Sequence, residues 1–140
     1  MVSTRPLLAL TAALSTRCDA LLGADVSRAG LDRARARLRN YLHVHLRRME
    51  VPHEWPEGRF DLVVIAEFAY YVPRRDLPAL VRRAVGSLDD GGHLAVMHYL
   101  GPIVGYELDA VEVHATFAGA GLTRLVDHRD ESFVLQVFAR

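Results

Sequence analysis

The spacing of apolar residues along the chain predicts four helices. Apolar positions recur every three to four residues over residues 6–16, 77–88 and 111–119, which is the repeat of a helix with one buried face. Ser27 is expected to cap a further helix, because a serine side chain can accept a hydrogen bond from an amide of the first turn. The inner face of that helix is expected to carry Leu31, Ala34 and Leu38. Its five arginines should then face the solvent.

Runs of apolar residues between these helices predict strands. Residues 20–25 suit a short buried strand that ends in a carboxylate. Residues 42–48 alternate between apolar and polar side chains, as a strand near the edge of a sheet does. Residues 60–66 are apolar almost throughout, which is typical of a parallel strand buried on both faces. A further strand is expected at residues 93–98, directly after an Asp-Asp-Gly-Gly turn.

The alternation of strands and helices predicts the class of the fold. This order favours an α/β fold of the doubly wound, Rossmann-like kind, in which helices cover both faces of a mostly parallel sheet. Residues 122–126 and 133–138 are expected to add a C-terminal antiparallel strand pair. A chain of 140 residues has room for one domain of ordinary size, so a single domain over residues 1–140 is expected.

Acidic residues follow two of the predicted strands, at the edge where doubly wound sheets bind their ligands. Asp25 stands where a nucleotide-binding sheet places the carboxylate that accepts hydrogen bonds from the two ribose hydroxyls of adenosine. The same residue equally suits the start of the helix capped by Ser27. Glu50 and Val51 follow residues 42–48 and are placed to approach an adenine ring. The alternative for Glu50 is a solvated side chain beside a proline turn.

A second group of candidate residues follows the next two strands. Glu67 ends the apolar run, so its carboxylate is expected to face a ligand crevice, since burial without a partner would be costly. Tyr70 and Tyr71 either line a substrate pocket or belong to the core. His98 can take a proton from a substrate amine or hydroxyl, or form a structural hydrogen bond. We therefore expect His98, Tyr71 and Tyr70 to be the catalytic residues, with His98 first.

The start of the chain departs from the usual pattern of nucleotide-binding sheets. In those sheets a glycine-rich turn precedes the acidic residue by about 20 positions. Counting back from Asp25 leads to residues 1–6, Met-Val-Ser-Thr-Arg-Pro, which contain no glycine and follow no apolar strand. The first strand of the sheet is therefore expected to be missing and the domain to be truncated at its N-terminus.

Composition and charge disfavour several classes of partner and compartment. Acidic and basic residues number 17 each, so the net charge is zero and no nucleic acid is expected to bind. The single cysteine, Cys18, and the lack of an apolar run that could span a membrane favour a cytoplasmic protein. A secretion signal over residues 5–14 is the alternative, although an amphipathic helix suits that segment better. His43 and His45 lack a third ligand at a metal-like spacing, so no metal is expected.

Four segments of the chain carry a resemblance to a known family. They are Arg17–Ser27, Val51–Glu67, Tyr70-Tyr71 and Leu88–Leu94. Through them the chain resembles the nodulation protein S-like family of S-adenosylmethionine-dependent methyltransferases, within the wider class I fold. The resemblance spans nearly the whole chain, and the stretch Val51–Glu67 is specific even by itself.

The resemblance implies a cofactor and residues that bind it. Asp25, with Val26 beside it, would hold the ribose of S-adenosylmethionine. Glu50 and Val51 would flank its adenine, and Glu67 would close the site around the methionine end. Asp25, Glu50 and Glu67 would then converge on one crevice, because their strands run side by side in the same direction.

These observations predict an enzyme that transfers a methyl group from S-adenosylmethionine to a nitrogen or oxygen of a small molecule, with an amino sugar as one candidate. The cofactor's sulfonium activates the methyl group, so the protein mainly aligns the acceptor. The family's glycine-rich motif has no match except a remnant at Ser3 and Thr4. A truncated, non-catalytic protein with a binding or structural role is therefore the alternative. An NAD-dependent oxidoreductase is disfavoured, because the chain contains no lysine for a Tyr-Lys pair.

Overall fold

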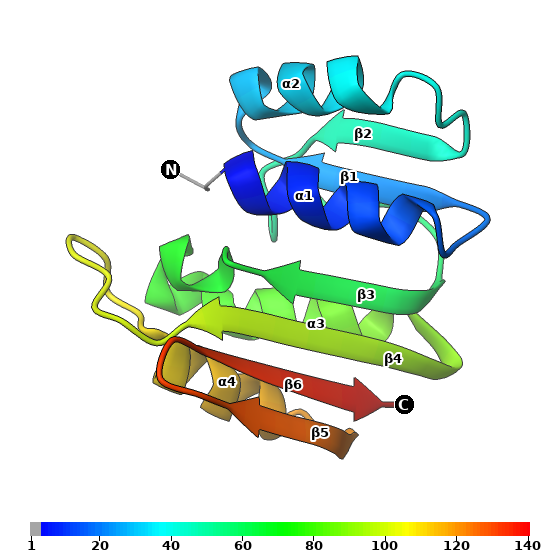
Figure 1. Ribbon diagram of the computed structural model, residues 1–140. Helices are drawn as coiled ribbons and strands as arrows, with labels where there is room; N and C mark the ends of the chain where they lie inside the picture. Colours follow the sequence, from blue (N-terminus) through cyan, green and yellow to red (C-terminus); the bar gives the residue numbers. More distant parts are fainter. Residues whose placement is uncertain (1–3) are drawn as a thin grey trace. The chain divides into compact units, whose positions relative to one another are not determined.

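The computed structural model describes residues 4–140 of the chain (Figure 1). These residues form two compact units, the first ending at Trp55 and the second running over Pro56–Arg140. No strand precedes the first helix within the described part of the chain. Ser3, half of the expected remnant of the glycine-rich motif, lies outside the described residues. A single domain over the whole chain stays a prediction.

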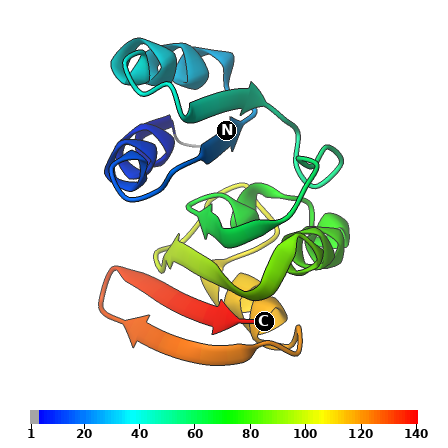
Figure 2. The same cartoon turned by 90° about the vertical axis from the view of Figure 1, so that its right-hand side faces the viewer.

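The first unit is built from two helices and two strands. In chain order its elements are α1 (Thr4–Ser15), β1 (Leu21–Asp25), α2 (Arg28–Leu38) and β2 (Val44–Arg48). The strands form a two-stranded parallel sheet, in which Asp25 pairs with Arg48 at the carboxyl ends. Parallel neighbours need a long connection, which α2 provides. Helices α1 and α2 lie on the same side of this sheet (Figure 2).

Helix α2 begins where its sequence predicts. The Ser27 hydroxyl oxygen accepts a hydrogen bond from the backbone N–H of Gly30 at 3.2 Å, so Ser27 is the N-cap. The expected inner face of Leu31, Ala34 and Leu38 is buried, and Gly30 is buried beside it. The arginines at positions 28, 33, 35, 37 and 39 are all exposed. The predicted amphipathic character of this helix is therefore confirmed.

The second unit contains one four-stranded sheet. Its strands are β3 (Phe60–Ala66), β4 (Leu88–Tyr99), β5 (Thr123–Arg129) and β6 (Phe133–Ala139). Their order across the sheet is β3-β4-β6-β5. β3 and β4 are parallel, whereas β6 is antiparallel to both β4 and β5. The predicted C-terminal antiparallel pair is thus confirmed.

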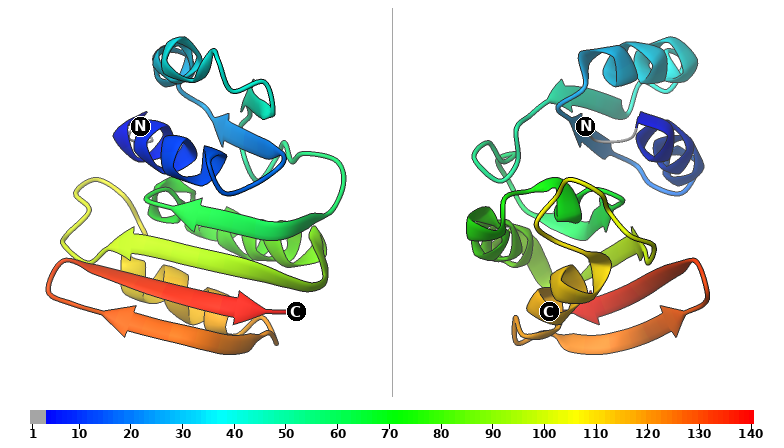
Figure 3. Two further views of the ribbon diagram at one scale, coloured as in Figure 1. Left: turned by 45° about the vertical axis from the view of Figure 1, so that its right-hand side comes forward. Right: turned by 90° about the vertical axis from the view of Figure 1, so that its left-hand side faces the viewer.

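Two α-helices of the second unit share one face of its sheet, α3 (Leu77–Gly86) and α4 (Ala110–Ala118). The short 3-10 helices η1 (Ala69–Tyr71) and η2 (Arg74–Asp76) lie in the segment between β3 and α3. Two views show α3 and α4 behind the same face (Figures 1 and 3). Along residues 94–98 of β4 and 134–138 of β6 the buried side chains alternate, and they are Leu94, Val96, His98, Val134, Gln136 and Phe138. Two of these six are polar, and both belong to the site described below.

Two predictions about strands were wrong. β3 was expected to be buried on both faces, but it is an outer strand of the four-stranded sheet, and Leu62 is 43% exposed. The Asp-Asp-Gly-Gly stretch at 89–92 was expected to be a turn, but it belongs to β4. The pairing of β4 with β3 shifts register there, and Gly91 has φ +76°. A side chain at Gly92 would come within 2.9 Å of a backbone oxygen, so these glycines allow an irregular start of the strand.

Neither a membrane span nor a metal site is found among residues 4–140. No helix in that range is both long and apolar enough to cross a membrane. No group of three or more His, Cys, Asp or Glu side chains in that range is arranged to hold a metal ion.

Candidate functional site

Asp25 lies at the carboxyl end of β1, and its side chain is only 4% exposed. Its Oδ1 atom accepts a hydrogen bond from the backbone N–H of Ser27 at 2.8 Å. Its Oδ2 atom is buried and has no hydrogen-bond partner among the described residues. Burial raises the pKa of the Asp25 carboxyl group, while the amides of Ser27 and Val26 oppose that rise. A buried carboxylate oxygen without a donor is costly, so this atom is suited to a ligand that brings one.

The other predicted cofactor residues of the first unit lie near Asp25. The backbone N–H of Met49 donates to the backbone oxygen of Asp25 at 3.1 Å, which joins the ends of β1 and β2. Val26 is exposed, Val51 is partly buried and Glu50 is exposed. Glu50 lies in the segment that directly follows β2. The structure therefore brings these four predicted residues to one edge of the first unit's sheet.

Glu67 follows β3 in an uncommon backbone conformation. Its φ is +52°, in the left-handed region that side chains other than glycine rarely adopt. Its carboxylate accepts two short hydrogen bonds, from the Tyr70 hydroxyl at 2.6 Å and from the backbone N–H of Tyr99 at 2.6 Å. Its own N–H donates to the backbone oxygen of Met97 at 2.9 Å. These contacts tie the end of β3 to the end of β4.

The two predicted tyrosines differ in exposure. Tyr70 is buried, and both burial and its hydrogen bond to Glu67 raise the pKa of its hydroxyl, so it remains a donor. Tyr71 is partly buried. Its ring contacts Tyr70 edge to face at a centroid distance of 4.8 Å and Tyr106 at 4.8 Å. Burial raises the pKa of Tyr71 as well, with the negative charge of Glu67 as a second cause.

His98 belongs to a buried chain of hydrogen bonds. The backbone N–H of Ala69 donates to Nε2 of His98 at 3.1 Å, so that nitrogen carries no proton. Nδ1 of His98 then carries the proton and donates to Nε2 of His114 at 3.1 Å. By the same logic, Nδ1 of His114 donates to Oε1 of Gln136 at 2.9 Å. The amide nitrogen of Gln136 donates to the carboxylate of Asp127 at 3.1 Å. Every polar atom along this His98 chain has a partner.

The environment of His98 favours a positioning role. Its side chain is 0% exposed, and both ring nitrogens are engaged. Burial and the neighbouring His114 lower the pKa of His98 to about 3, so the ring is neutral at pH 7. Through Ala69 the ring fixes the start of η1, and with it the segment between Glu67 and Tyr71. Proton removal by His98 stays a prediction.

His114 and Gln136 were not among the predicted site residues. His114 lies on the buried face of α4 between apolar residues, and Gln136 interrupts the buried face of β6. A polar residue at a position where the helical or strand repeat expects an apolar one is the signal that could have found them.

Acid is expected to destabilise the protein through these two histidines. Burial lowers the pKa of both His98 and His114 in the folded state, while Asp127 and Arg129 act on His114 in opposite directions. The unfolded chain binds protons at the ordinary pKa of histidine, so the contribution of both residues is complete above about pH 6.5 and is lost as the pH falls through their lowered pKa values, which in the case of His98 means about 3. Each histidine that takes up a proton on unfolding adds a slope of about 1.4 kcal/mol per pH unit. Urea unfolding between pH 7 and pH 5 measures this slope.

A variant separates this effect from the titration of carboxylates. Replacing both histidines with glutamine, which does not titrate, should flatten the dependence of the unfolding free energy on pH between 7 and 5. An equally steep dependence in the double variant would show that other groups cause it.

The predicted residues divide between the two units. Asp25, Val26, Glu50 and Val51 lie in the first unit, and Glu67, Tyr70, Tyr71 and His98 lie in the second. Within each unit the residues gather at the carboxyl ends of parallel strands. The convergence of all three carboxylates on one crevice stays a prediction.

Comparison with known proteins identifies relatives of this chain. Residues 8–92 match the model of a family described as a methyltransferase domain. Nodulation protein S from Rhizobium tropici is 37% identical over 90 residues, which are 61% of this chain and 37% of that protein. The chain thus spans little more than a third of that curated relative.

Solved structures resemble this chain closely. A putative methyltransferase from Pseudomonas syringae has a TM-score of 0.82 and 34% identity, and the match covers 94% of this chain and 80% of that one. The N-methyltransferase NodS from Bradyrhizobium japonicum, in complex with S-adenosyl-L-homocysteine, has a TM-score of 0.84 and 23% identity, over 96% of this chain and 73% of that one. The likeness to NodS shows the fold, and the predicted Rossmann-like α/β class is confirmed.

The matches agree on one family. The family model covers more than half of the chain, and it includes the segments that hold Asp25, Glu50 and Glu67. From the strand ends, the buried Asp25 carboxylate and these matches, we conclude that the chain belongs to the methyltransferase domain family.

Proposed function

We propose that this protein uses S-adenosylmethionine to methylate a nitrogen of a small molecule. The observation that carries the proposal is the buried Oδ2 atom of Asp25, which has no partner among the described residues. A ribose hydroxyl would supply the missing hydrogen-bond donor, while Oδ1 is already held by Ser27. The structure of NodS with S-adenosyl-L-homocysteine supports the choice of cofactor.

Other residues of the chain suit the remaining parts of the cofactor. Val26, Glu50 and Val51 would flank the adenine, since they stand beside Asp25 at the same strand edge. Glu67 would hold the ammonium group of the methionine end. Each of its oxygens accepts one hydrogen bond in the structure, and a carboxylate has about four lone-pair sites, which leaves room for further donors.

The bound cofactor supplies an activated methyl group on a positive sulfonium. The protein's contribution is then to hold the acceptor in line and to keep water away. Tyr71 would orient the acceptor, while Tyr70 and His98 hold the segment that carries it. His98 is the first candidate for the base that removes a proton from the acceptor. Its pKa of about 3 and its two hydrogen bonds make that proton removal difficult. The raised pKa values of both tyrosines likewise keep them protonated.

The shifted pKa values of His98, Tyr70 and Tyr71 favour nitrogen over oxygen as the acceptor atom. A neutral amine attacks with its lone pair and can lose its proton after the methyl group has moved, whereas a hydroxyl needs a base beforehand. None of the three residues predicted to be catalytic offers such a base near neutral pH. An amino sugar is one acceptor of this kind, and the described relative NodS is an N-methyltransferase.

Two measurements test the proposal. Isothermal titration with S-adenosylmethionine is expected to show micromolar binding, and a chain that does not bind would favour the alternative of a non-catalytic protein. Transfer of a radiolabelled methyl group is expected to glucosamine and not to glucose, which matches it except for the amine. Equal transfer to both sugars would contradict the preference for nitrogen.

A further inference from the structure

Two segments of the second unit meet at the carboxyl ends of neighbouring strands. Residues 67–76 follow β3 and include η1 and η2, and residues 100–109 follow β4 and lead into α4. Both leave the same end of the sheet (Figures 1 and 3). Ligands of α/β proteins bind at this end, so whatever joins the two segments also shapes a site there.

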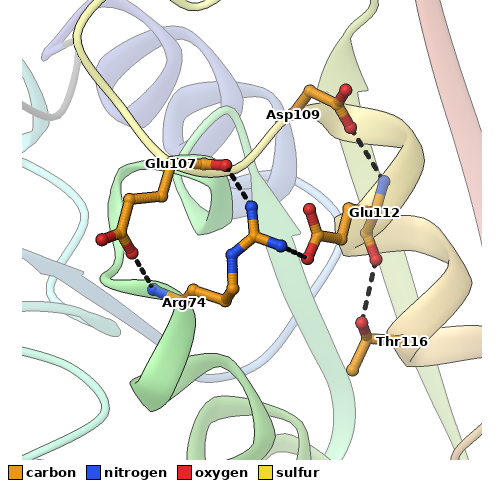
Figure 4. Close-up of polar contacts among 5 residues, drawn as sticks. All are labelled: Arg74, Glu107, Asp109, Glu112 and Thr116. Atoms are coloured by element: carbon orange, nitrogen blue, oxygen red, sulfur yellow. Dashed lines mark hydrogen bonds and ion pairs between the residues drawn. The ribbon is translucent and has the colours of Figure 1, made fainter.

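Arg74 joins the two segments through two contacts, and a third contact reaches α4 (Figure 4). Its backbone N–H donates to the Glu107 carboxylate at 2.8 Å, and its guanidinium donates to the Glu107 backbone oxygen at 2.7 Å. The guanidinium also pairs with Glu112 on α4 at 2.5 Å. Glu112 is fixed in turn, because its backbone N–H donates to the side chain of Asp109 at 2.9 Å. An exposed ion pair contributes little stability, so the main effect of Arg74 is to fix the backbone at Glu107.

Tyr106 is the neighbour of Glu107, whose carboxylate and backbone oxygen both accept hydrogen bonds from Arg74. On the other side of Tyr106, Gly105 has φ +83° and Val104 is 88% exposed, so neither anchors the ring in the core. The Tyr106 ring lies edge to face against Tyr71, with centroids 4.8 Å apart and planes at 76°. We call these two rings the aromatic corner. Tyr106, its outer member, is 43% exposed.

The aromatic corner adjoins the Glu67 carboxylate. Tyr71 contacts Tyr70 at 4.8 Å, and the Tyr70 hydroxyl donates to Glu67 at 2.6 Å. Two tyrosine rings at a steep angle offer a face and an edge to a small molecule. The corner is thus an apolar surface beside a negative charge.

We propose that the aromatic corner receives the methyl acceptor and that Arg74 is the positioning residue that keeps Tyr106 in it. This inference rests on the proposed function. Tyr106 contacts the acceptor and selects for molecules with a surface that packs against its ring. Arg74 contacts neither the acceptor nor the cofactor and acts through Glu107.

The test measures steady-state kinetics with glucosamine as the acceptor probe. Tyr106→Ala is expected to raise the KM for glucosamine about tenfold, and Arg74→Ala about threefold to tenfold, with the KM for S-adenosylmethionine changed less than about twofold. Tyr106→Phe keeps the ring and should restore the wild-type KM. Arg75→Ala is the matched control for Arg74, because Arg75 is the adjacent exposed arginine.

Hydrogen exchange tests the positioning step without any ligand. Arg74→Ala should accelerate exchange of the backbone amides of residues 103–107, whereas Arg75→Ala should not. A Tyr106→Ala variant with an unchanged KM for glucosamine overturns the acceptor role, and an Arg74→Ala variant with unchanged exchange overturns the positioning role. Failure of the proposed function is distinct from either, because the wild-type protein would then not bind S-adenosylmethionine.

Discussion

Replacing His98 with leucine is expected to lower the free energy of unfolding by about 3 kcal/mol. Leucine has a similar volume but no polar atom, so the Ala69 N–H and Nε2 of His114 both lose their partners. Each buried polar group left without a partner costs about 1–3 kcal/mol. His98 is fully buried, so water cannot replace these hydrogen bonds. Urea denaturation followed by circular dichroism at pH 7 measures the change.

Glutamine at position 98 is the matched control. Its side chain carries both an acceptor and a donor, so it can meet Ala69 and His114 at once and should recover most of the stability. Equal stability of the His98→Leu variant and the wild type would show that the chain of hydrogen bonds contributes nothing. Because leucine and glutamine are both uncharged, their difference reports on hydrogen bonding alone.

Replacing Asp25 with asparagine is expected to weaken the binding of S-adenosylmethionine by about 30-fold. A hydrogen bond to a charged group contributes about 1.5–3 kcal/mol, and the amide that replaces one oxygen cannot accept from a hydroxyl. The unfolding free energy should stay the same or rise, because the burial that raises the pKa of this carboxyl also disfavours its charge. Isothermal titration measures the affinity, and urea denaturation measures the stability.

The affinity for S-adenosylmethionine should fall while the free energy of unfolding stays the same or rises, and this combination makes the experiment specific. A residue that only supports the fold would lose stability and binding together. Asp19→Asn is the control, because Asp19 is an exposed aspartate of the same unit. Unchanged affinity in the Asp25→Asn variant would remove the main support for the proposed cofactor site.

The local pattern of the chain predicts most elements of the fold, and the errors have physical causes. The caps and stripes of α2 and α4 depend on residues three to four positions apart, so the sequence contains the whole signal. The register of a sheet depends on residues far apart. The start of β4 was therefore mistaken for a turn, since two glycines in an irregular strand resemble two glycines in a turn.

The sequence predicts those residues of the candidate site that a local pattern marks, and it does not predict their distant partners. Asp25 is the last residue of an apolar strand and Glu67 directly follows one, and that position alone marks them. The partners of His98 come from other elements, at sequence separations of 29 residues to Ala69 and 16 to His114. No short-range pattern connects such residues, so the sequence alone keeps both proton removal and a structural hydrogen bond open for His98.

The backbone at Glu67 has a consequence for how this position can change. Its left-handed φ costs about 1–3 kcal/mol for a residue with a side chain, and glycine alone would relieve that cost. Glycine would also remove the carboxylate that holds the Tyr70 hydroxyl and the Tyr99 amide. The backbone conformation thus favours glycine at this position, whereas the two hydrogen bonds of the carboxylate favour glutamate. Variation in related chains should accordingly be narrow here, with glutamate retained in spite of its conformation.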